Sequence, residues 1–237
     1  AISFLMWGEL SRLLVKLDAD QDVRAVVITG AGEEAFSAGA DISDFEEYRS
    51  DSIKGLRYNN AVNGLLQTLD TMATPTISMI RGFAVGGGCE LAIATDIRLA
   101  AEDSRLGIPV ARLGISIGHQ EMRGLVSLVG KGNALYILLS GRLVDALEAK
   151  DMGLVNQVLP PGQLVETTYK LAKDIACLAP LSHRANKETL NQIISKPSLD
   201  NLTPEEANLP LAQFDTLDYK EGYQAFLEKR RPQFTGE

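Results

Sequence analysis

Apolar and polar positions along this chain follow two different periods. Two segments, Ser3–Leu17 and Ile53–Thr71, repeat apolar residues at helical spacing. Short β-branched runs at Val23–Thr29 and Pro75–Ile80 predict buried strands. The same reading predicts strands at Ile97–Ala100 and Val155–Leu159 and helices at Cys89–Thr95, Glu121–Val129, Asn133–Ser140, Asp145–Asp151, Gln163–Cys177 and His183–Ser195. Because strands alternate with helices, the pattern predicts an α/β fold.

The strand signal fades toward the C-terminus, where helical patterns continue. We therefore divide the chain into a mixed core over residues 1–178 and a helical region over residues 179–237. Two interpretations of the helical region stay open at this point. It serves assembly of several copies, or it caps the core of its own chain.

Composition narrows the class of protein. The 237 residues are 45% apolar and carry 23 basic against 31 acidic side chains, a formal net charge of −8. This excludes intrinsic disorder, and it argues against nucleic acid or an anionic membrane as partner, because both need clustered basic charge. No apolar run is long enough to span a membrane. Only two cysteines, Cys89 and Cys177, are present, so we expect no disulfide framework and a cytoplasmic location.

One glycine pattern has the spacing of a dinucleotide-binding fingerprint. Gly30 to Ala35 reads G-A-G-E-E-A after a predicted strand. That mechanism places a pyrophosphate on a helix N-terminus. Here Glu33 and Glu34 would face the phosphates, and another glycine-rich loop follows instead of a helix. The pattern therefore argues only weakly for a nucleotide.

A second pattern has the form of a nucleophile elbow. Gly114–Gly118 reads G-I-S-I-G around Ser116, and Asp145 or Asp151 and then His183 follow in hydrolase order. The residues before Ser116 make a poor strand, whereas the elbow requires one. A serine hydrolase stays as an alternative, beside a plain loop that needs small residues.

A third pattern pairs two loops, Ala35–Asp41 and Gly82–Glu90, which each follow a predicted strand. Small side chains let backbone N–H groups approach a ligand closely, and two such groups aimed at one carbonyl form an oxyanion hole. Glu90 comes just after the second loop. In an apolar, glycine-lined pocket its pKa would be raised, so that it could move protons. The alternative is that Glu90 caps its own helix and the glycines serve packing.

These loops resemble the crotonase (enoyl-CoA hydratase/isomerase) superfamily, and the resemblance extends over essentially the whole chain. The segments that carry it are AFSAGADISDF at Ala35–Phe45, the stretch Gly82–Pro109, the stretch Leu139–Pro160 and FLEKRRPQF at Phe226–Phe234. The resemblance implies a spiral of ββα turns with C-terminal helices that build homo-trimers, commonly paired into hexamers. It implies an acyl-CoA thioester as substrate, with coenzyme A as part of that substrate and with no metal or other cofactor. It also places the family's leading strand before Ala1.

The resemblance assigns roles to several residues. The backbone N–H groups of Ala40 and Gly87 would hold the thioester oxygen, and Glu90 would stand at one of the two catalytic glutamate positions of the hydratases. Three further residues would line the adenine and ribose of CoA: Ala38, Asp41 and Ile42.

The chain departs from the family at the second glutamate position, where Val110 follows Gly107-Ile-Pro109. Valine has no proton to exchange, so the hypothesis of an enoyl-CoA hydratase needs another group. Glu121 and His119, in the altered loop that follows, are the candidates. Two alternatives remain: an enoyl-CoA isomerase that uses Glu90 alone, and an acyl-CoA binder with weak or lost catalysis.

Overall fold

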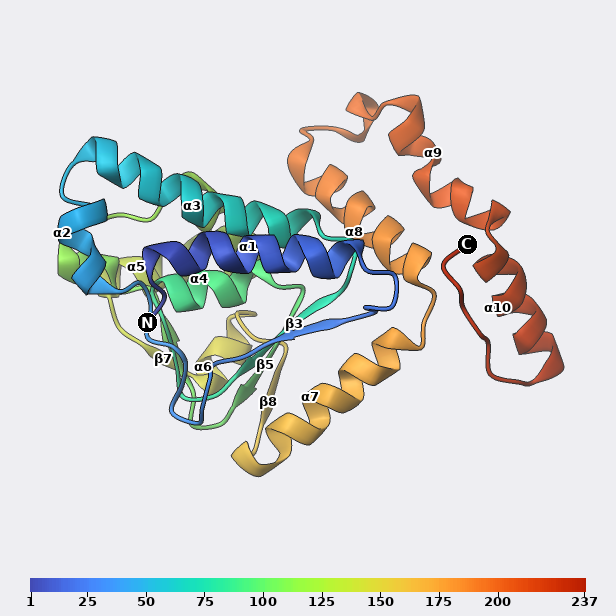
Figure 1. Cartoon of the computed structure of the whole chain (residues 1–237), viewed down its shortest axis with the longest axis horizontal. Coiled ribbons are helices and arrows are strands. Elements are labelled where there is room, and N and C mark those ends of the chain that lie inside the picture. Colours follow the sequence, from blue (N-terminus) through green and yellow to red (C-terminus); the bar gives the residue numbers. More distant parts are fainter.

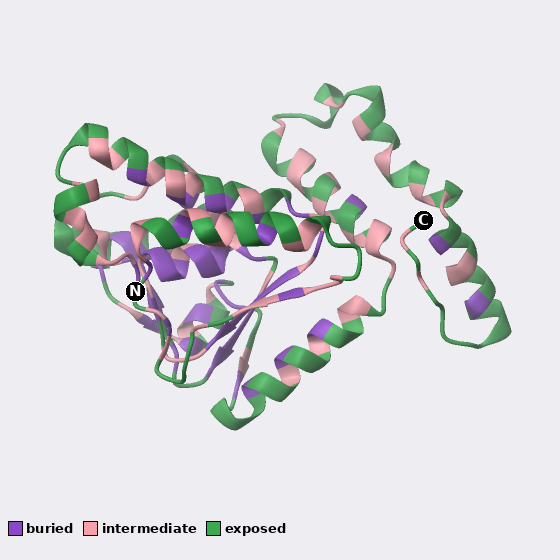
Figure 2. Cartoon of the chain, viewed as in Figure 1, coloured by how far each residue is buried: buried purple, intermediate pink, exposed green.

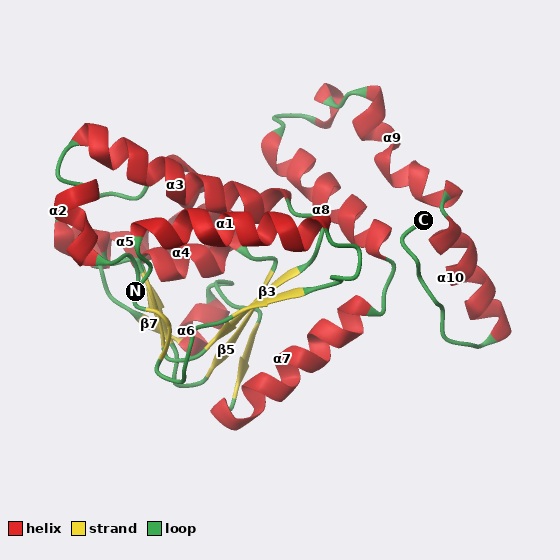
Figure 3. Cartoon of the chain, viewed as in Figure 1, coloured by secondary structure: helices red, strands yellow, loops and turns green.

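The computed structural model describes all 237 residues as helices alternating with short strands (Figure 3). The α-helices are α1 (Phe4–Ala19), α2 (Phe45–Tyr48), α3 (Ser52–Thr71), α4 (Gly87–Ala94), α5 (His119–Ser140), α6 (Ala146–Asp151), α7 (Pro161–Ala176), α8 (Pro180–Ser195), α9 (Pro204–Ala212) and α10 (Leu217–Glu228). The strands are β1 (Val26–Ile28), β2 (Ala35–Ser37), β3 (Thr76–Ile80), β4 (Phe83–Val85), β5 (Ile97–Ala101), β6 (Arg105–Gly107), β7 (Val144–Asp145) and β8 (Gln157–Leu159). The predicted α/β class is confirmed.

The strands form two four-stranded sheets. The first has the order β1-β3-β5-β8 and the second the order β2-β4-β6-β7. All neighbours pair in parallel except β6 and β7, which are antiparallel. Along the chain β1 precedes β2, β3 precedes β4 and β5 precedes β6, so each turn adds one strand to each sheet before a helix returns. This is the ββα spiral that the resemblance implies.

The second sheet was not predicted. Its strands β2 and β4 lie inside stretches that the sequence pattern describes as glycine-rich loops, Gly30–Asp41 and Gly82–Gly88. Each is three residues long, too short for a periodic pattern to show. They exist because they pair with each other and with β6 across long sequence separations. The loop interpretation of these two stretches was therefore wrong in part.

The main helices lie close to their predicted ranges, and local chemistry explains their limits. The Asp51 side chain caps α3 by accepting from the N–H groups of Ile53 and Lys54. Helix α5 is broken at Gly130, whose φ of 72° and ψ of 168° are not helical, which confirms the two predicted helical segments. Asp145 caps α6 in a capping box with Glu148.

The hydrophobic core lies between the two sheets and the helices α1, α3, α4 and α5. Helices α1 and α3 run side by side over the strands (Figure 1). Trp7 of α1 and Tyr58 of α3 are almost fully buried, and the Trp7 Nε1–H donates to the Tyr58 hydroxyl over 2.9 Å. This hydrogen bond joins α1 to α3, and the Trp7 ring lies beside Gly87 of α4.

The C-terminal helices differ from the rest. Helix α8 is attached to the core, because Lys187 Nζ pairs with Asp96 at 2.8 Å and Asn191 Nδ2 donates to the Asp70 carbonyl at 2.7 Å. Helices α9 and α10 project away from the sheets (Figure 1) and are exposed over most of their surface (Figure 2). The exposed side chains of these helices and of the turn between them include large apolar ones: Leu211, Phe214, Leu217, Tyr219, Tyr223, Phe226 and Leu227.

Candidate active site

A cavity of about 260 Å³ lies where the two predicted loops meet. Its walls come from α1, the segment after β2, the first half of α3, the turn from β4 into α4, and the segment from Pro109 into α5. Both the oxyanion candidates and the acidic residues Glu90 and Glu121 line it.

The turn into α4 admits only glycine at several places. Gly86 has φ 53° and ψ −123°, a conformation that is strained for other residues, and its N–H donates to the Gly107 carbonyl at 2.8 Å. A Cβ on Gly87 would lie 3.0 Å from two ring atoms of Trp7. A Cβ on Gly88 would lie 2.6 Å from Ser37 Cβ. The glycines thus let the α4 turn approach both α1 and β2.

This close packing brings two backbone N–H groups together. A Cβ on Gly87 would be 3.5 Å from the Ala40 nitrogen, and a Cβ on Gly39 would be 3.7 Å from the Gly87 nitrogen. The Ala40 N–H donates no hydrogen bond within the protein, while its neighbours on both sides pair with Ile2. Gly87 stands in the first turn of α4, where N–H groups have no partner within the helix. The two nitrogens therefore lie near each other at the cavity, and neither N–H has a partner within the secondary structure.

Glu90 projects from the first turn of α4 into the same cavity. Its pKa is raised to about 8, mainly because burial disfavours the charged form. The charge of Glu121 raises this pKa as well, and the guanidinium of Arg49 acts in the opposite direction. At neutral pH Glu90 is mostly protonated in the free protein.

Glu121 reaches the cavity from the first turn of α5 and is 7% exposed. Its Oε2 is buried and has no hydrogen-bond partner in the protein. A Cβ on Gly118 would lie 2.5 Å from this oxygen, so the glycine leaves room for the carboxyl in its present position. A buried carboxylate oxygen without a partner calls for a hydrogen-bond donor from outside the chain.

The sequence pattern did not reveal three further residues that line the cavity: Arg49, Phe45 and Tyr58. The Arg49 guanidinium lies 4.7 Å from the ring centroids of both aromatic residues. This cation–π stacking holds a positive charge near Glu90. Nothing in the sequence pattern marks Arg49, because it lies just past the short helix α2 and gains its role only from the fold.

The remaining predicted residues are placed unequally. Ala38 and Ile42 line the cavity mouth, whereas the Asp41 carboxylate caps the 3₁₀ turn Ile42–Asp44 by accepting from Ser43 and does not line the cavity. Val110 lines the cavity at the position where the family has its second glutamate. His119 lies outside the cavity lining.

The structure does not assemble the competing motifs. Ser116 lines the cavity, but His183 lies on α8 beside the carbonyl of Ile175, in a different cavity. The segment from Gly30 leads into β2 and not into a helix, which removes the structural basis of the dinucleotide fingerprint. No group of three or more His, Cys, Asp or Glu side chains is placed to hold a metal ion, and none of the helices is long and apolar enough to cross a bilayer.

Comparison with known proteins agrees with this geometry. A model of the enoyl-CoA hydratase/isomerase family matches residues 1–237, the whole of the chain. The chain belongs to this family. The crotonase fold expected from the resemblance is confirmed by a crystal structure of an enoyl-CoA hydratase/carnithine racemase from Magnetospirillum magneticum. The two structures superpose with a TM-score of 0.96 at 34% identity, over 100% of this chain and 88% of the other.

Two family members illustrate the similarity in sequence. A short-chain-enoyl-CoA hydratase of Clostridium acetobutylicum is 35% identical over 94% of this chain and 84% of its own length. A crotonyl-CoA hydratase of Syntrophomonas wolfei is 34% identical over 95% of this chain and 86% of its own length. The similarity to named hydratases thus extends over nearly the full length of both chains.

Proposed function

We propose that this protein is an enoyl-CoA hydratase, which adds water across the C2–C3 double bond of a 2-enoyl-CoA. One observation carries the proposal: two carboxyl groups from separate helices, Glu90 and Glu121, line one cavity beside the two free N–H groups of Ala40 and Gly87. The hydratases among its relatives supply the substrate class.

The N–H groups of Ala40 and Gly87 bind the thioester oxygen. Electron density moves onto this oxygen when a nucleophile adds at C3, and the two donors stabilise the resulting enolate. A single donor of this kind is typically worth about 10²–10³ in rate. The rigid glycine turn holds the donors in place before the substrate arrives.

Burial and the charge of Glu121 raise the pKa of Glu90 to about 8, so Glu90 holds a proton at neutral pH. The ionised carboxylate takes a proton from water as the water oxygen bonds to C3. The protonated carboxyl gives its proton to C2 as the enolate collapses. One proton has entered the pair and one has left. The proton then passes from the carboxyl that acted as base to the one that acted as acid, which restores the starting state.

Glu121 in this account replaces the glutamate that is absent at Val110. His119 has no role in it, since its side chain lies outside the cavity. Coenzyme A enters as part of the substrate, and we place its adenosine end near Ala38, Asp41 and Ile42 at the cavity mouth. No further cofactor takes part.

A second candidate is favoured by the valine at position 110. An enoyl-CoA isomerase moves a proton between C2 and C4 with one carboxylate, and Glu90 alone could do so. The presence of Glu121 in the cavity favours hydration, because isomerisation needs only one carboxylate and would not use this second buried carboxyl group.

We further propose that residues 1–178 form the catalytic core and residues 179–237 an assembly region that builds homo-trimers, alone or paired into hexamers. Phe226 and Leu227 on α10 are 82% and 73% exposed, more than isolated apolar side chains require. Light scattering would give the mass of the assembly. We expect Phe226→Lys to dissociate it, whereas a monomeric wild-type protein would contradict the proposal.

Two free thiols, Cys89 and Cys177, suit the reducing cytoplasm.

The test of the activity is a steady-state assay with crotonyl-CoA that follows the loss of conjugated thioester absorbance. We expect turnover that Glu90→Ala abolishes. If crotonyl-CoA is bound but unchanged while a 3-enoyl-CoA is converted to the 2-enoyl form, the protein is an isomerase and the hydratase proposal is wrong.

A further inference from the structure

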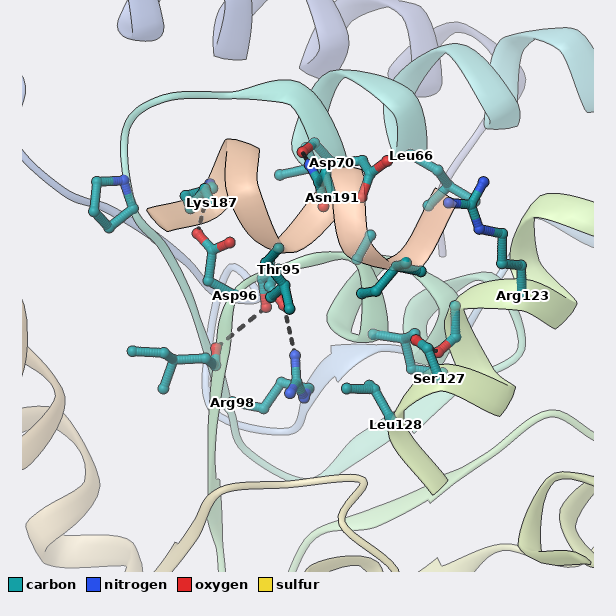
Figure 4. Close-up of a pocket in the computed structure, with 18 of the residues that line it drawn as sticks. Leu66, Asp70, Thr95, Asp96, Arg98, Arg123, Ser127, Leu128, Lys187 and Asn191 are labelled. Atoms are coloured by element: carbon teal, nitrogen blue, oxygen red, sulfur yellow. Dashed lines mark hydrogen bonds and ion pairs between the residues drawn. The ribbon is translucent and has the colours of Figure 1, made fainter. Parts of the chain in front are cut away.

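A second cavity, of about 510 Å³, lies behind the catalytic carboxyl groups. It is bounded by α3, α4, α5 and α8 (Figure 4). Glu90 and Glu121 are the only residues that line both this rear cavity and the front cavity that holds the oxyanion donors. The carboxyl pair therefore stands between two separate openings.

The rear cavity has largely apolar walls, but several charged side chains also line it. Asp96 and Lys187 form an ion pair inside it, and Asp70 and Arg123 line its upper side (Figure 4). The guanidinium of Arg98 is 3% exposed and donates only to the carbonyls of Leu154 and Thr95, with no carboxylate as partner. An acyl chain placed against these groups would remove water from their remaining polar surface, which is costly.

Water fits the same walls well. A buried water needs roughly 10–15 Å³ of accessible space and two or more polar partners, and the cavity offers both many times over. The carboxyl groups of Glu90 and Glu121 and the Asp96–Lys187 ion pair supply such partners along the cavity.

The hydration reaction needs a supply of water. Each turnover consumes one water at C3, yet the bound acyl-CoA fills the front cavity from the CoA side. We propose that the rear cavity is a water-filled route through which water reaches the Glu90–Glu121 pair while substrate occupies the front. This inference rests on the proposed hydratase function.

Two positions on α5 allow the route to be narrowed. Gly124 lies one turn beyond Glu121 and lines the rear cavity, and a Cβ there would lie 3.3 Å from Ile93 Cγ2 on α4. Ser127 lines it one turn further along, near the surface (Figure 4). Gly132 is a matched control, because it is a glycine of the same helix with open space around it and it lines neither cavity.

The experiment compares Gly124→Leu, Ser127→Trp and Gly132→Leu with the wild type, on crotonyl-CoA and on a ten-carbon 2-enoyl-CoA. We expect both narrowing variants to lower kcat about fivefold or more on both substrates, with KM little changed, because water and not the acyl-CoA is obstructed. They should also move the upper limb of the kcat/KM profile to higher pH, since Glu90 loses hydration and its pKa rises further. Gly132→Leu should match the wild type.

Binding of acetoacetyl-CoA, which is not hydrated, checks that the front cavity is intact in every variant. A loss of activity confined to the ten-carbon substrate would show that the rear cavity holds the acyl chain, and it would overturn the inference. Unchanged kcat and pH profile in both narrowing variants would overturn it as well. A wild-type protein that hydrates neither substrate would refute the proposed function itself, and the inference with it.

Discussion

Two segments face each other across the front cavity and are built in opposite ways. The turn Gly86–Glu90 is tightly packed: a Cβ on Gly87 or Gly88 would collide with Trp7 or Ser37. The segment Val110–Glu121 is open: Leu113 is 52% exposed, and a Cβ on Gly114 would have no atom within 4 Å. Each segment nevertheless ends in a carboxyl group that lines the cavity.

The difference shows which changes each side can tolerate. Oxyanion donors are backbone groups, so their position depends on close packing of the backbone, which only a specific run of glycines permits. A carboxyl group sits on a flexible side chain and can reach one place from several backbone positions. The open segment could therefore supply Glu121 in place of the family's glutamate at Val110 without disturbing the turn opposite.

The largest expected effect tests whether both sides contribute equally to catalysis. Glu121→Gln and Glu90→Gln should each lower kcat for hydration of crotonyl-CoA by about 10²–10⁴, because each removes one proton carrier. KM should change little, since both groups act on the reacting atoms. Steady-state kinetics would measure this.

The matched control for that experiment is His119→Gln, two residues from Glu121 on the same helix. Its side chain lies outside the cavity, so its kcat should equal that of the wild type. A loss in His119→Gln as large as in Glu121→Gln would show that the proton carrier of the open segment has been assigned to the wrong residue.

A second expected difference between the two segments is the cost of backbone strain. Gly86→Ala should lower the free energy of unfolding by about 2–3 kcal/mol, because φ 53° with ψ −123° is a region that side chains avoid. Denaturant unfolding would measure the change. A Gly86→Ala protein as stable as the wild type would mean that the turn is less constrained than its dihedral angles imply.

The buried carboxyl of the tight segment should also make stability depend on pH. The pKa of Glu90 is raised from 4.5 to about 8 in the folded protein, so the folded state keeps a proton that the unfolded chain releases. The free energy of unfolding therefore falls as pH rises from about 4.5 to about 8. Glu90→Gln lacks this loss and should gain up to about 5 kcal/mol over the wild type across that range.

Thermal unfolding of both proteins at several pH values would show the effect as a widening gap in Tm. A gap that stays constant from about pH 4.5 to about pH 8 would contradict a raised pKa for Glu90.

The smallest effect belongs to the open segment. Gly114 has φ 69° and ψ 22°, the left-handed region that other residues can adopt at a modest cost. Gly114→Ala should lower the free energy of unfolding by about 1 kcal/mol, less than Gly86→Ala. If the order of the two costs is reversed, the open segment is the more constrained one.

The same contrast explains what the sequence could reveal. Helix α3 was predictable because its apolar residues recur at helical spacing over many residues, and strand β3 was predictable because it is a short run rich in β-branched residues. The three-residue strands β2 and β4 were not, because they are stabilised by pairing partners that are far away in sequence. Glu90 was marked by the glycines before it, and Glu121 could be named as a candidate only because Val110 left a role unfilled.

Arg49 shows where sequence reasoning ends. Its guanidinium stacks on Phe45 and Tyr58, which come from different helices, and its effect on Glu90 depends on that placement. No local pattern records such a meeting of three elements. The rear cavity is invisible for the same reason, since it is formed by helices that are adjacent only in the fold.

The most direct test of the account is a double-mutant cycle on hydration of crotonyl-CoA, with the wild type, Glu90→Gln, Glu121→Gln and the variant that carries both changes. If the two carboxyl groups act as a unit, the double variant should be no more than about threefold slower than the slower single variant. A Glu121→Gln protein that keeps wild-type kcat would contradict the central claim, because the open segment would then supply no catalytic group.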